Sequence, residues 1–152
     1  MMKLRYSPTS PYVRKCTVLA LETGLHDRIE RIPTNVADPA SDIKKDNPLG
    51  KVPTLILEDG TQIYDSPVIC EYLDSLHGGM KIIPAAGAAR WTALRRQALA
   101  DGVMDAGMLR LMEGRRPANE QSPGWIEKQK GVVARGLDAL EKEIDDFGEA
   151  VD

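Results

Sequence analysis

Four Ser-Pro pairs supply the serines that are most open to a chemical interpretation in this sequence. The pairs that begin at Ser10, Ser66 and Ser122 each precede an apolar stretch with helical spacing. Serine is a good N-cap and proline fits the first helical position, so each pair by itself predicts only the start of a helix. Ser122 serves as the control for this interpretation, because nothing around it suggests chemistry.

Ser10 and Ser66 lack one feature of a purely structural helix start. Val13 and Ile69 stand three positions after them, where a capping box would have Glu or Gln. Without that reciprocal cap, backbone N–H groups at the helix start stay available to an external anion. The basic residues at 14–15 oppose the helix dipole at a cost of roughly a few tenths of a kcal/mol each, which favours a negatively charged ligand nearby.

The loop before Pro53 offers a second kind of contact. A residue that precedes proline is held extended, so Val52 presents its backbone just before a strand. Its N–H and C=O groups can pair with an extended peptide in the manner of an added strand. A simple strand start explains the same residues without a ligand, and the residues alone favour that interpretation.

The elements that would position these groups alternate over the first 78 residues. The predicted order is β-α-β-(α)-β-β-α, with a crossover first, a hairpin later and mixed strand pairing. Asp59-Gly60 is the turn of the hairpin, and a brief helix is expected with Asp38 as N-cap and Pro39 at its first position. The other expected elements are a strand at 2–6, a helix at 11–23, a strand at 28–34, a hairpin at 54–64, and a helix that Ser66 caps and Gly78 ends.

Beyond residue 78 nothing has the pattern of a strand. Residues 79–87 are linker-like, a long helix is predicted from about residue 88 to 113, and a second amphipathic helix follows the break before Ile126. The expected fold class is therefore an α/β N-terminal domain over residues 1–78 and an all-α helical domain over residues 88–152.

Composition excludes several classes of function. The 152 residues carry a net charge of −3, which gives no electrostatic reason to expect nucleic acid or a membrane as partner. No leader-like segment and no run of apolar residues long enough to span a bilayer occurs, so a cytoplasmic protein is expected. Cys16 and Cys70 are too few and too far apart for a disulfide framework or a zinc site, and we expect buried thiols and no metal.

Three motifs together have a familiar order and spacing. SPTSPYVRK, NPLGKVPTL and DGTQIYDSPVICEYL, followed by a helical segment, resemble the soluble glutathione S-transferases of the serine type. The resemblance covers the whole chain and is densest between residues 47 and 76. It implies a thioredoxin-like N-terminal domain and a helical C-terminal domain.

The resemblance also implies how glutathione would bind. Pro53 would be the cis-proline of the fold, and the backbone of Val52 would pair with the cysteinyl unit. Asp65 and Ser66 would hold the γ-glutamyl end, which suits an ammonium beside a carboxylate and a carboxylate at a helix start. Lys51 would contact the glycine carboxylate or the neighbouring backbone.

Ser10 takes the position of the family's activating residue. A serine cannot form a mixed disulfide, but its O–H can donate to the glutathione sulfur and favour the thiolate. A thiol pKa lowered by two units needs roughly 2.7 kcal/mol, and a hydrogen bond to a charged group supplies about 1.5–3 kcal/mol. Ser7 and Thr9 are alternative donors, while His26 and His77 are expected to be surface residues.

In the helical segment, Asp101 lies in line with an apolar stripe. The resemblance implies that it reaches the γ-glutamyl amine of a neighbouring subunit; the alternatives are a solvated carboxylate or a pair with Arg95 or Arg96. Met104 and Met108 would line the pocket of the second substrate, although methionines at this spacing are more often plain core.

The resemblance thus implies a homodimeric detoxification enzyme that conjugates glutathione, its co-substrate, to small electrophiles. Relatives that use glutathione as isomerases, dehalogenases or lyases are one alternative, and a non-catalytic interaction module on the same fold is another. The helical domain of the family normally runs further than this chain, so a truncated domain is expected, with apolar helix faces left uncovered.

Overall fold

The computed structural model describes residues 1–146 and separates into two compact units, Met1–Ile83 and a second that begins at Pro84. The first unit contains a four-stranded mixed sheet with the strand order β2-β1-β3-β4. Strand β1 is parallel to β2 and antiparallel to β3, and β3 is antiparallel to β4. The strands are β1 (Met2–Tyr6), β2 (Ile29–Pro33), β3 (Thr54–Ile56) and β4 (Gln62–Ile63).

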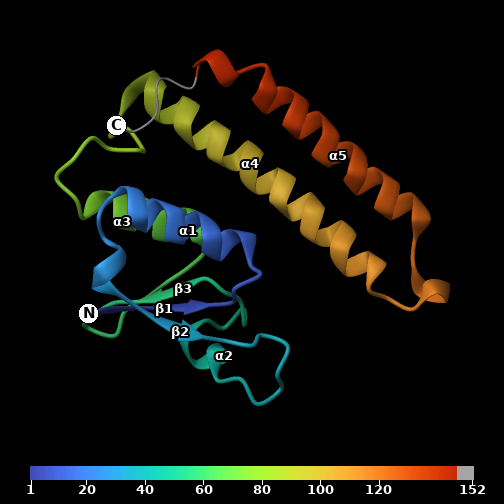
Figure 1. The fold of residues 1–152 in the computed structure, drawn as a ribbon, viewed down its shortest axis with the longest axis horizontal. Coiled ribbons are helices and arrows are strands. Elements are labelled where there is room, and N and C mark those ends of the chain that lie inside the picture. Colours follow the sequence, from blue (N-terminus) through green and yellow to red (C-terminus); the bar gives the residue numbers. More distant parts are fainter. Residues whose placement is uncertain (147–152) are drawn as a thin grey trace. The chain divides into compact units, whose positions relative to one another are not determined.

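Helices lie on both faces of this sheet. The helices are α1 (Pro11–Glu22), α2 (Ile43–Asp46) and α3 (Ser66–Ser75), and a 3₁₀ turn spans His26–Arg28. Figure 1 shows α1 and α3 side by side over one face and α2 beyond the other. This order of elements is the one that the sequence predicts, including the hairpin at Gly60, which adopts a positive φ of 87°.

The alternation of β1 explains which face is covered. Met2 and Leu4 are buried, whereas Lys3 is exposed, because successive side chains of a strand point to opposite faces. The buried face meets the apolar sides of α1 and α3. The core cluster on that side consists of Met2, Leu4, Cys16, Leu19, Ala20, Leu25, Leu55, Ile69, Cys70 and Leu73.

The short helix α2 begins later than the sequence suggests. Asp38 does not cap a helix; its carboxylate accepts the N–H of Ala40 at 2.9 Å, and its carbonyl accepts the N–H of Ser41 at 3.0 Å. This local turn satisfies the polar groups of Asp38 without a helix, which is a common alternative for Asp. The helix starts only after Asp42, at Ile43.

Helix α3 also differs from its expected bounds. Asp65 is the N-cap and Ser66 is the first helical residue, one position earlier than predicted. The helix ends at Ser75 with Leu76 as C-cap, so Gly78 is not its stop signal.

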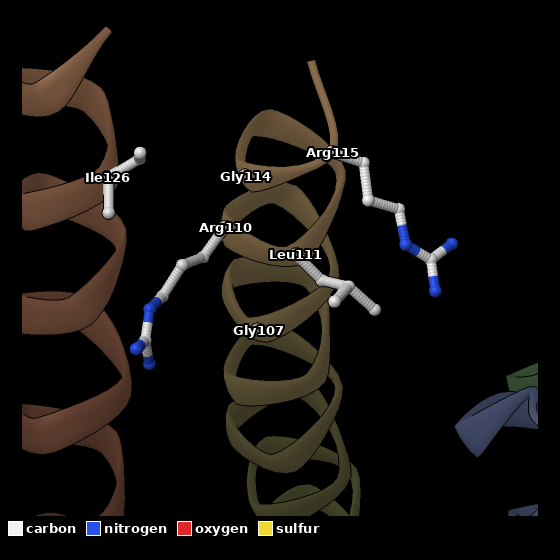
Figure 2. Close-up of a pocket in the computed structure, with 6 residues that line it drawn as sticks. All are labelled: Gly107, Arg110, Leu111, Gly114, Arg115 and Ile126. Atoms are coloured by element: carbon white, nitrogen blue, oxygen red, sulfur yellow. The ribbon is translucent and has the colours of Figure 1, made fainter. Parts of the chain in front are cut away.

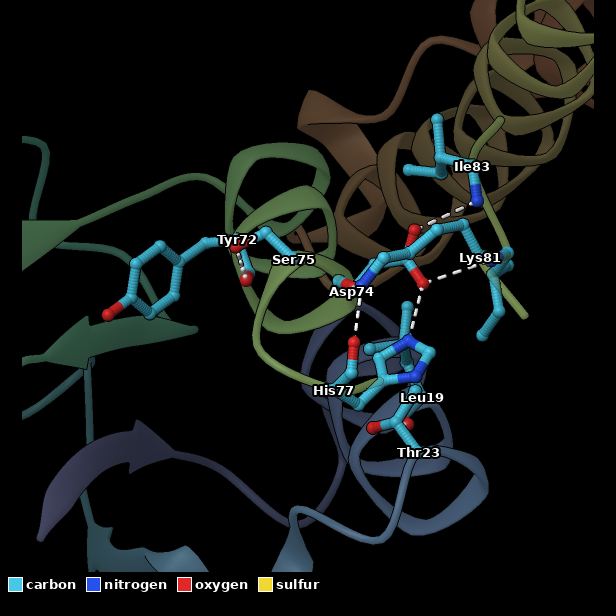
Figure 3. A network of polar contacts seen from close by, with 9 residues as sticks. Leu19, Thr23, Tyr72, Asp74, Ser75, His77, Lys81 and Ile83 are labelled. Atoms are coloured by element: carbon cyan, nitrogen blue, oxygen red, sulfur yellow. Dashed lines mark hydrogen bonds and ion pairs between the residues drawn. The ribbon is translucent and has the colours of Figure 1, made fainter. Parts of the chain in front are cut away.

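A buried carboxylate fixes the turn after α3. Asp74 is 3% exposed and accepts hydrogen bonds from the backbone N–H of Ile82 at 2.9 Å and of Ile83 at 3.0 Å. It also accepts from Nε2 of His77 at 2.8 Å, and Lys81 donates to the carbonyls of Asp74 and His77 (Figure 3). The expectation that His77 is a surface residue is therefore wrong, since its side chain is 11% exposed and paired.

The second unit is a helical hairpin. Helix α4 (Gly87–Gly114) runs antiparallel to α5 (Pro123–Glu141), with 3₁₀ turns at Ala118–Glu120 and Ile144–Asp146 (Figure 1). Gly136 allows close packing, since a Cβ there would lie 2.3 Å from Cγ2 of Val103. Several large apolar side chains of this hairpin remain exposed, as the sequence predicts: Trp91, Leu109, Leu111, Met112 and Leu137.

Candidate functional site at one edge of the sheet

The strand directions bring three loops to the same edge of the sheet. Strand β1 ends at this edge, and the antiparallel β3 begins there because Arg5 pairs with Thr54. Strand β4 ends there as well, since Ile63 pairs with Leu55. The loops attached to these strand ends contain Ser7, Thr9, Ser10, Lys51, Val52, Pro53 and Asp65, and the third leads into Ser66.

Ser10 is the N-cap of α1. Its Oγ accepts the N–H of Val13 at 3.3 Å, and its own N–H donates to the carbonyl of Ser7 at 3.2 Å. The Val13 N–H is thus satisfied by the serine itself, without a capping box. A hydroxyl keeps its O–H donor while it accepts, so the cap leaves Ser10 able to donate. The hydroxyls of Ser7 and Thr9 share a hydrogen bond of 3.3 Å with each other.

The second loop carries a cis peptide bond between Val52 and Pro53. Pro53 is buried, Val52 is half-buried and Lys51 is exposed. The loop is held from inside by Asn47 and Thr54, whose exposed fractions are 1% and 0%. Sequence reasoning missed both residues, although an Asn-Pro pair at the start of a loop is a recognisable turn signal.

Arg5 fixes the segment that leads into this loop. It lies on the face of β1 opposite Leu4, and its guanidinium contacts Asp42 at 2.9 Å and Asp46 at 2.6 Å. The hydrogen bond from Arg5 lowers the pKa of Asp42 below its ordinary value. A charged residue that alternates with buried Leu4 is the signal that would have found this anchor.

The third loop ends at the start of α3. The Tyr64-Asp65 peptide bond is cis, Asp65 is exposed, and Ser66 is 2% exposed. The carbonyl of Asp65 accepts the N–H of Ile69 at 3.0 Å, while its carboxylate makes no cap. The carboxylate therefore faces outward at the helix start.

The two cysteines lie close together, Cys16 on α1 and Cys70 on α3. Cys16 Sγ lies 3.9 Å from the carbonyl oxygen of Ser66 and 3.9 Å from Cys70 Sγ. Both cysteines are buried thiols and not a disulfide pair, as the sequence predicts.

Asp101, Met104 and Met108 belong to the second unit. All three lie half-buried on α4. Arg95 and Arg96, which the sequence offers as partners of Asp101, both bind Glu143: Arg95 at 2.7 and 2.8 Å, Arg96 at 2.9 Å.

Two surface grooves run along the helical hairpin. The larger, about 530 Å³, is lined by Gly107, Arg110, Leu111, Gly114, Arg115 and Ile126. Figure 2 shows Arg110 extended toward α5, whereas Leu111 and Arg115 point away from it. The two guanidinium groups therefore do not converge on one ligand position, and neither this groove nor the smaller one is lined by Met104 or Met108.

Residues 1–146 contain neither a membrane-spanning helix nor a cluster of three or more candidate metal ligands. No helix in this range is long and apolar enough to cross a membrane. Within the same range, no group of three or more His, Cys, Asp or Glu side chains is placed to hold a metal ion.

Comparisons with known proteins give a consistent result. A family model described as the N-terminal domain of glutathione S-transferase matches residues 9–76. The uncharacterized GST-like protein YibF of Escherichia coli K12 is 40% identical over 141 residues, which span 92% of this chain and 68% of that protein.

Solved structures extend the likeness. A glutathione S-transferase from Methylobacillus flagellatus KT with glutathione bound has a TM-score of 0.90 and 44% identity, over 95% of this chain and 71% of that one. A glutathione transferase family member from Pseudomonas fluorescens Pf-5 with bound glutathione has a TM-score of 0.92 and 39% identity, over 100% of this chain and 76% of that one. The predicted fold class is thereby confirmed: a thioredoxin-like N-terminal domain followed by a helical region.

Proposed function

Because the chain belongs to the glutathione S-transferase family, as its motifs predict, we propose that it binds glutathione at this sheet edge and conjugates it to small electrophiles. The observation that supports glutathione most directly is its presence in two similar structures at 44% and 39% identity. The convergence of three loops at one edge, each with a residue suited to a different part of the tripeptide, agrees with that ligand.

In the proposed complex, each end of glutathione meets a group of suitable charge. The Asp65 carboxylate, exposed and uninvolved in capping, pairs with the γ-glutamyl ammonium. The γ-glutamyl carboxylate sits at the start of α3, a ten-residue helix whose first N–H groups attract anions. The backbone of Val52 pairs with the cysteinyl unit, and Lys51, which is exposed, reaches the glycine carboxylate.

Ser10 then stabilises the thiolate. Its O–H donates to the glutathione sulfur while its lone pair continues to accept the N–H of Val13. The thiol proton leaves to solvent, the thiolate attacks an electrophilic carbon, and the leaving group departs with the electron pair of the broken bond. Holding both reactants together supplies a further part of the rate.

Two parts of the proposal involve α4. Met104 and Met108 provide adaptable apolar surface for the electrophile. Asp101 approaches the γ-glutamyl amine of a neighbouring subunit, which requires a homodimer.

The decisive experiment compares Ser10→Ala with Ser122→Ala. Both serines cap a helix and accept an N–H at 3.3 Å, so both variants lose the same local contact. Thiolate absorbance is followed as pH is raised with glutathione bound. Loss of a hydrogen bond to a charged group, about 1.5–3 kcal/mol, is expected to raise the bound thiol pKa by about 1–2 units in Ser10→Ala only.

The other outcomes redirect or refute the proposal. An unchanged titration in Ser10→Ala would transfer the role to Ser7 or Thr9. Absence of glutathione binding in the unmodified chain would refute the proposed function and favour a non-catalytic interaction module.

A further inference from the structure

The carbonyl of Lys51 is anchored by two buried donors. Asn47 donates to it from Nδ2 at 3.1 Å, and Thr54 donates to it from Oγ1 at 2.9 Å. Nδ2 of Asn47 also donates to Oγ1 of Thr54 at 3.1 Å. The Asn47 amide, the Thr54 hydroxyl and the Lys51 carbonyl are therefore all hydrogen-bonded to one another. Both side chains are almost fully buried, at 1% and 0% exposure, and water therefore does not compete for these contacts.

This anchor determines where the next N–H points. The Lys51-Val52 peptide bond is trans and planar, so its C=O and N–H groups point in opposite directions. A carbonyl held toward the interior by Asn47 and Thr54 directs the N–H of Val52 toward the outside of the loop. That N–H belongs to the residue that pairs with the cysteinyl unit in the proposed complex.

The backbone and the side-chain oxygen of Asn47 are also hydrogen-bonded. Its N–H donates to the carbonyl of Ile43 at 2.8 Å, its Oδ1 accepts the N–H of Leu49 at 2.9 Å, and its carbonyl accepts the N–H of Gly50 at 2.8 Å. The preceding residue, Asp46, binds Arg5 of β1. The orientation of the loop is thereby coupled to β1, one of the two inner strands of the sheet.

We propose that Asn47 is a positioning residue for glutathione, which acts through the Lys51 carbonyl to orient the N–H of Val52. The inference rests on the proposed function and adds a residue to it. Asn47 does not touch the tripeptide. It affects how well the backbone of Val52 is presented and leaves the ionisation of the sulfur to Ser10.

Asn47→Asp is the most selective test of this role. The carboxylate keeps an oxygen for the N–H of Leu49 but replaces the NH₂ donor by an acceptor that faces the Lys51 carbonyl. Thr54→Val removes the second donor with little change in shape, and Thr54→Ser restores a hydroxyl. Asp74→Asn is the control for a purely structural effect, because it weakens a buried network in the same unit away from this loop.

Calorimetric titration with S-methylglutathione measures binding without a titratable thiol. We expect the Kd to rise roughly tenfold in Asn47→Asp, equivalent to about 1.4 kcal/mol, and to rise in Thr54→Val but recover in Thr54→Ser. Ser10→Ala is expected to show the opposite pattern: the Kd for S-methylglutathione stays unchanged, and the thiol pKa of bound glutathione rises. Asp74→Asn is expected to lower the melting temperature and leave the Kd unchanged.

Each outcome decides the question. An unchanged Kd in Asn47→Asp overturns the positioning role while the proposed function stands, and so does an equal rise in Asp74→Asn, which would reveal a general effect of stability. If Asn47→Asp does not fold, Thr54→Val tests the same role: a raised Kd supports it and an unchanged Kd overturns it. Failure of the unmodified chain to bind S-methylglutathione overturns the proposed function and this inference with it.

Discussion

Asp74→Asn is the substitution whose effect on stability follows most directly from the contacts. Oδ1 of Asp74 accepts from His77 and from the N–H of Ile82, and Oδ2 accepts from the N–H of Ile83. An amide has one oxygen, so its NH₂ must face at least one of these donors. The residue is 3% exposed, and water cannot replace the missing acceptor.

The expected loss is substantial for a unit of this size. A hydrogen bond to a charged group contributes about 1.5–3 kcal/mol, and the N–H left without an acceptor adds a desolvation penalty of similar size. We expect a loss of at least about 2 kcal/mol. For a domain of 60–100 residues this lowers the melting temperature by about 8–16 °C.

The loss of stability in Asp74→Asn should be smaller at acid pH than at neutral pH. Burial raises the pKa of Asp74, but hydrogen bonds from His77 and from the backbone of Ile83 and Ile82 lower it more, and the net pKa lies below its ordinary value. A depressed carboxylate pKa stabilises the folded state above the unfolded pKa, about 3.9, and this contribution is lost as pH falls toward the folded value. The gap between the unmodified chain and Asp74→Asn should therefore narrow below about pH 4.

Thermal unfolding followed by circular dichroism at several pH values measures both the decrease in melting temperature and its dependence on pH. Asp27→Asn is the matched control, because Asp27 is exposed in a 3₁₀ turn of the same unit. The reasoning would be refuted if Asp74→Asn lowered the melting temperature by no more than Asp27→Asn does. It would also be refuted if the difference in melting temperature between the unmodified chain and Asp74→Asn stayed constant from neutral to acid pH.

Two substitutions test the helical hairpin. Gly136→Ala places a Cβ 2.3 Å from Cγ2 of Val103, so α4 and α5 must shift at a cost of about 1–3 kcal/mol; Gly102→Ala, where nothing lies within 4 Å, should not lower the melting temperature. The hydrogen bonds of two α4 arginines lower the pKa of Glu143 from 4.5 to about 2, so its stabilising effect is present above 4.5 and is lost as pH falls toward 2. Glu143→Gln should therefore lower the melting temperature at neutral pH but not near pH 2, and equal effects at both pH values would contradict this assignment.

Elements with a strong local signal were predictable from the sequence. The hairpin at Asp59-Gly60 has a turn that needs a positive φ, and Gly60 adopts it. Helix α5 begins after Ser122 as the Ser-Pro pair indicates. In each case the determining contacts lie within a few residues along the chain, where spacing and residue type are informative.

Elements with competing local options were not predictable. Asp38 can cap a helix or close a turn on Ala40, and both use the same carboxylate. His77 is polar and follows a helix, which is typical of a surface residue, yet Asp74 buries and pairs it. The pairing itself is local, three residues apart. The further contacts around it come from Lys81, Ile82 and Ile83, and no pattern within α3 encodes the path of that segment.

The candidate site also contains residues that the sequence indicates and one that only the structure reveals. Val52, Pro53, Asp65 and Ser66 belong to motifs whose order is visible in the sequence. Asn47 acts on a backbone carbonyl, and backbone carbonyls carry no sequence signal. Its role emerges only when the direction of the peptide plane is known.

Ser10 and Ser122 together show why local structure alone does not mark the proposed activating residue. Each is an N-cap followed by proline, and each accepts an N–H at 3.3 Å. The two serines thus share their local geometry, and both keep a hydroxyl donor. What distinguishes Ser10 is strand direction: it follows β1 at the edge where the antiparallel β3 begins and β4 ends. Sheet topology therefore gives Ser10 neighbouring loops suited to a tripeptide, whereas Ser122 follows a helical hairpin turn.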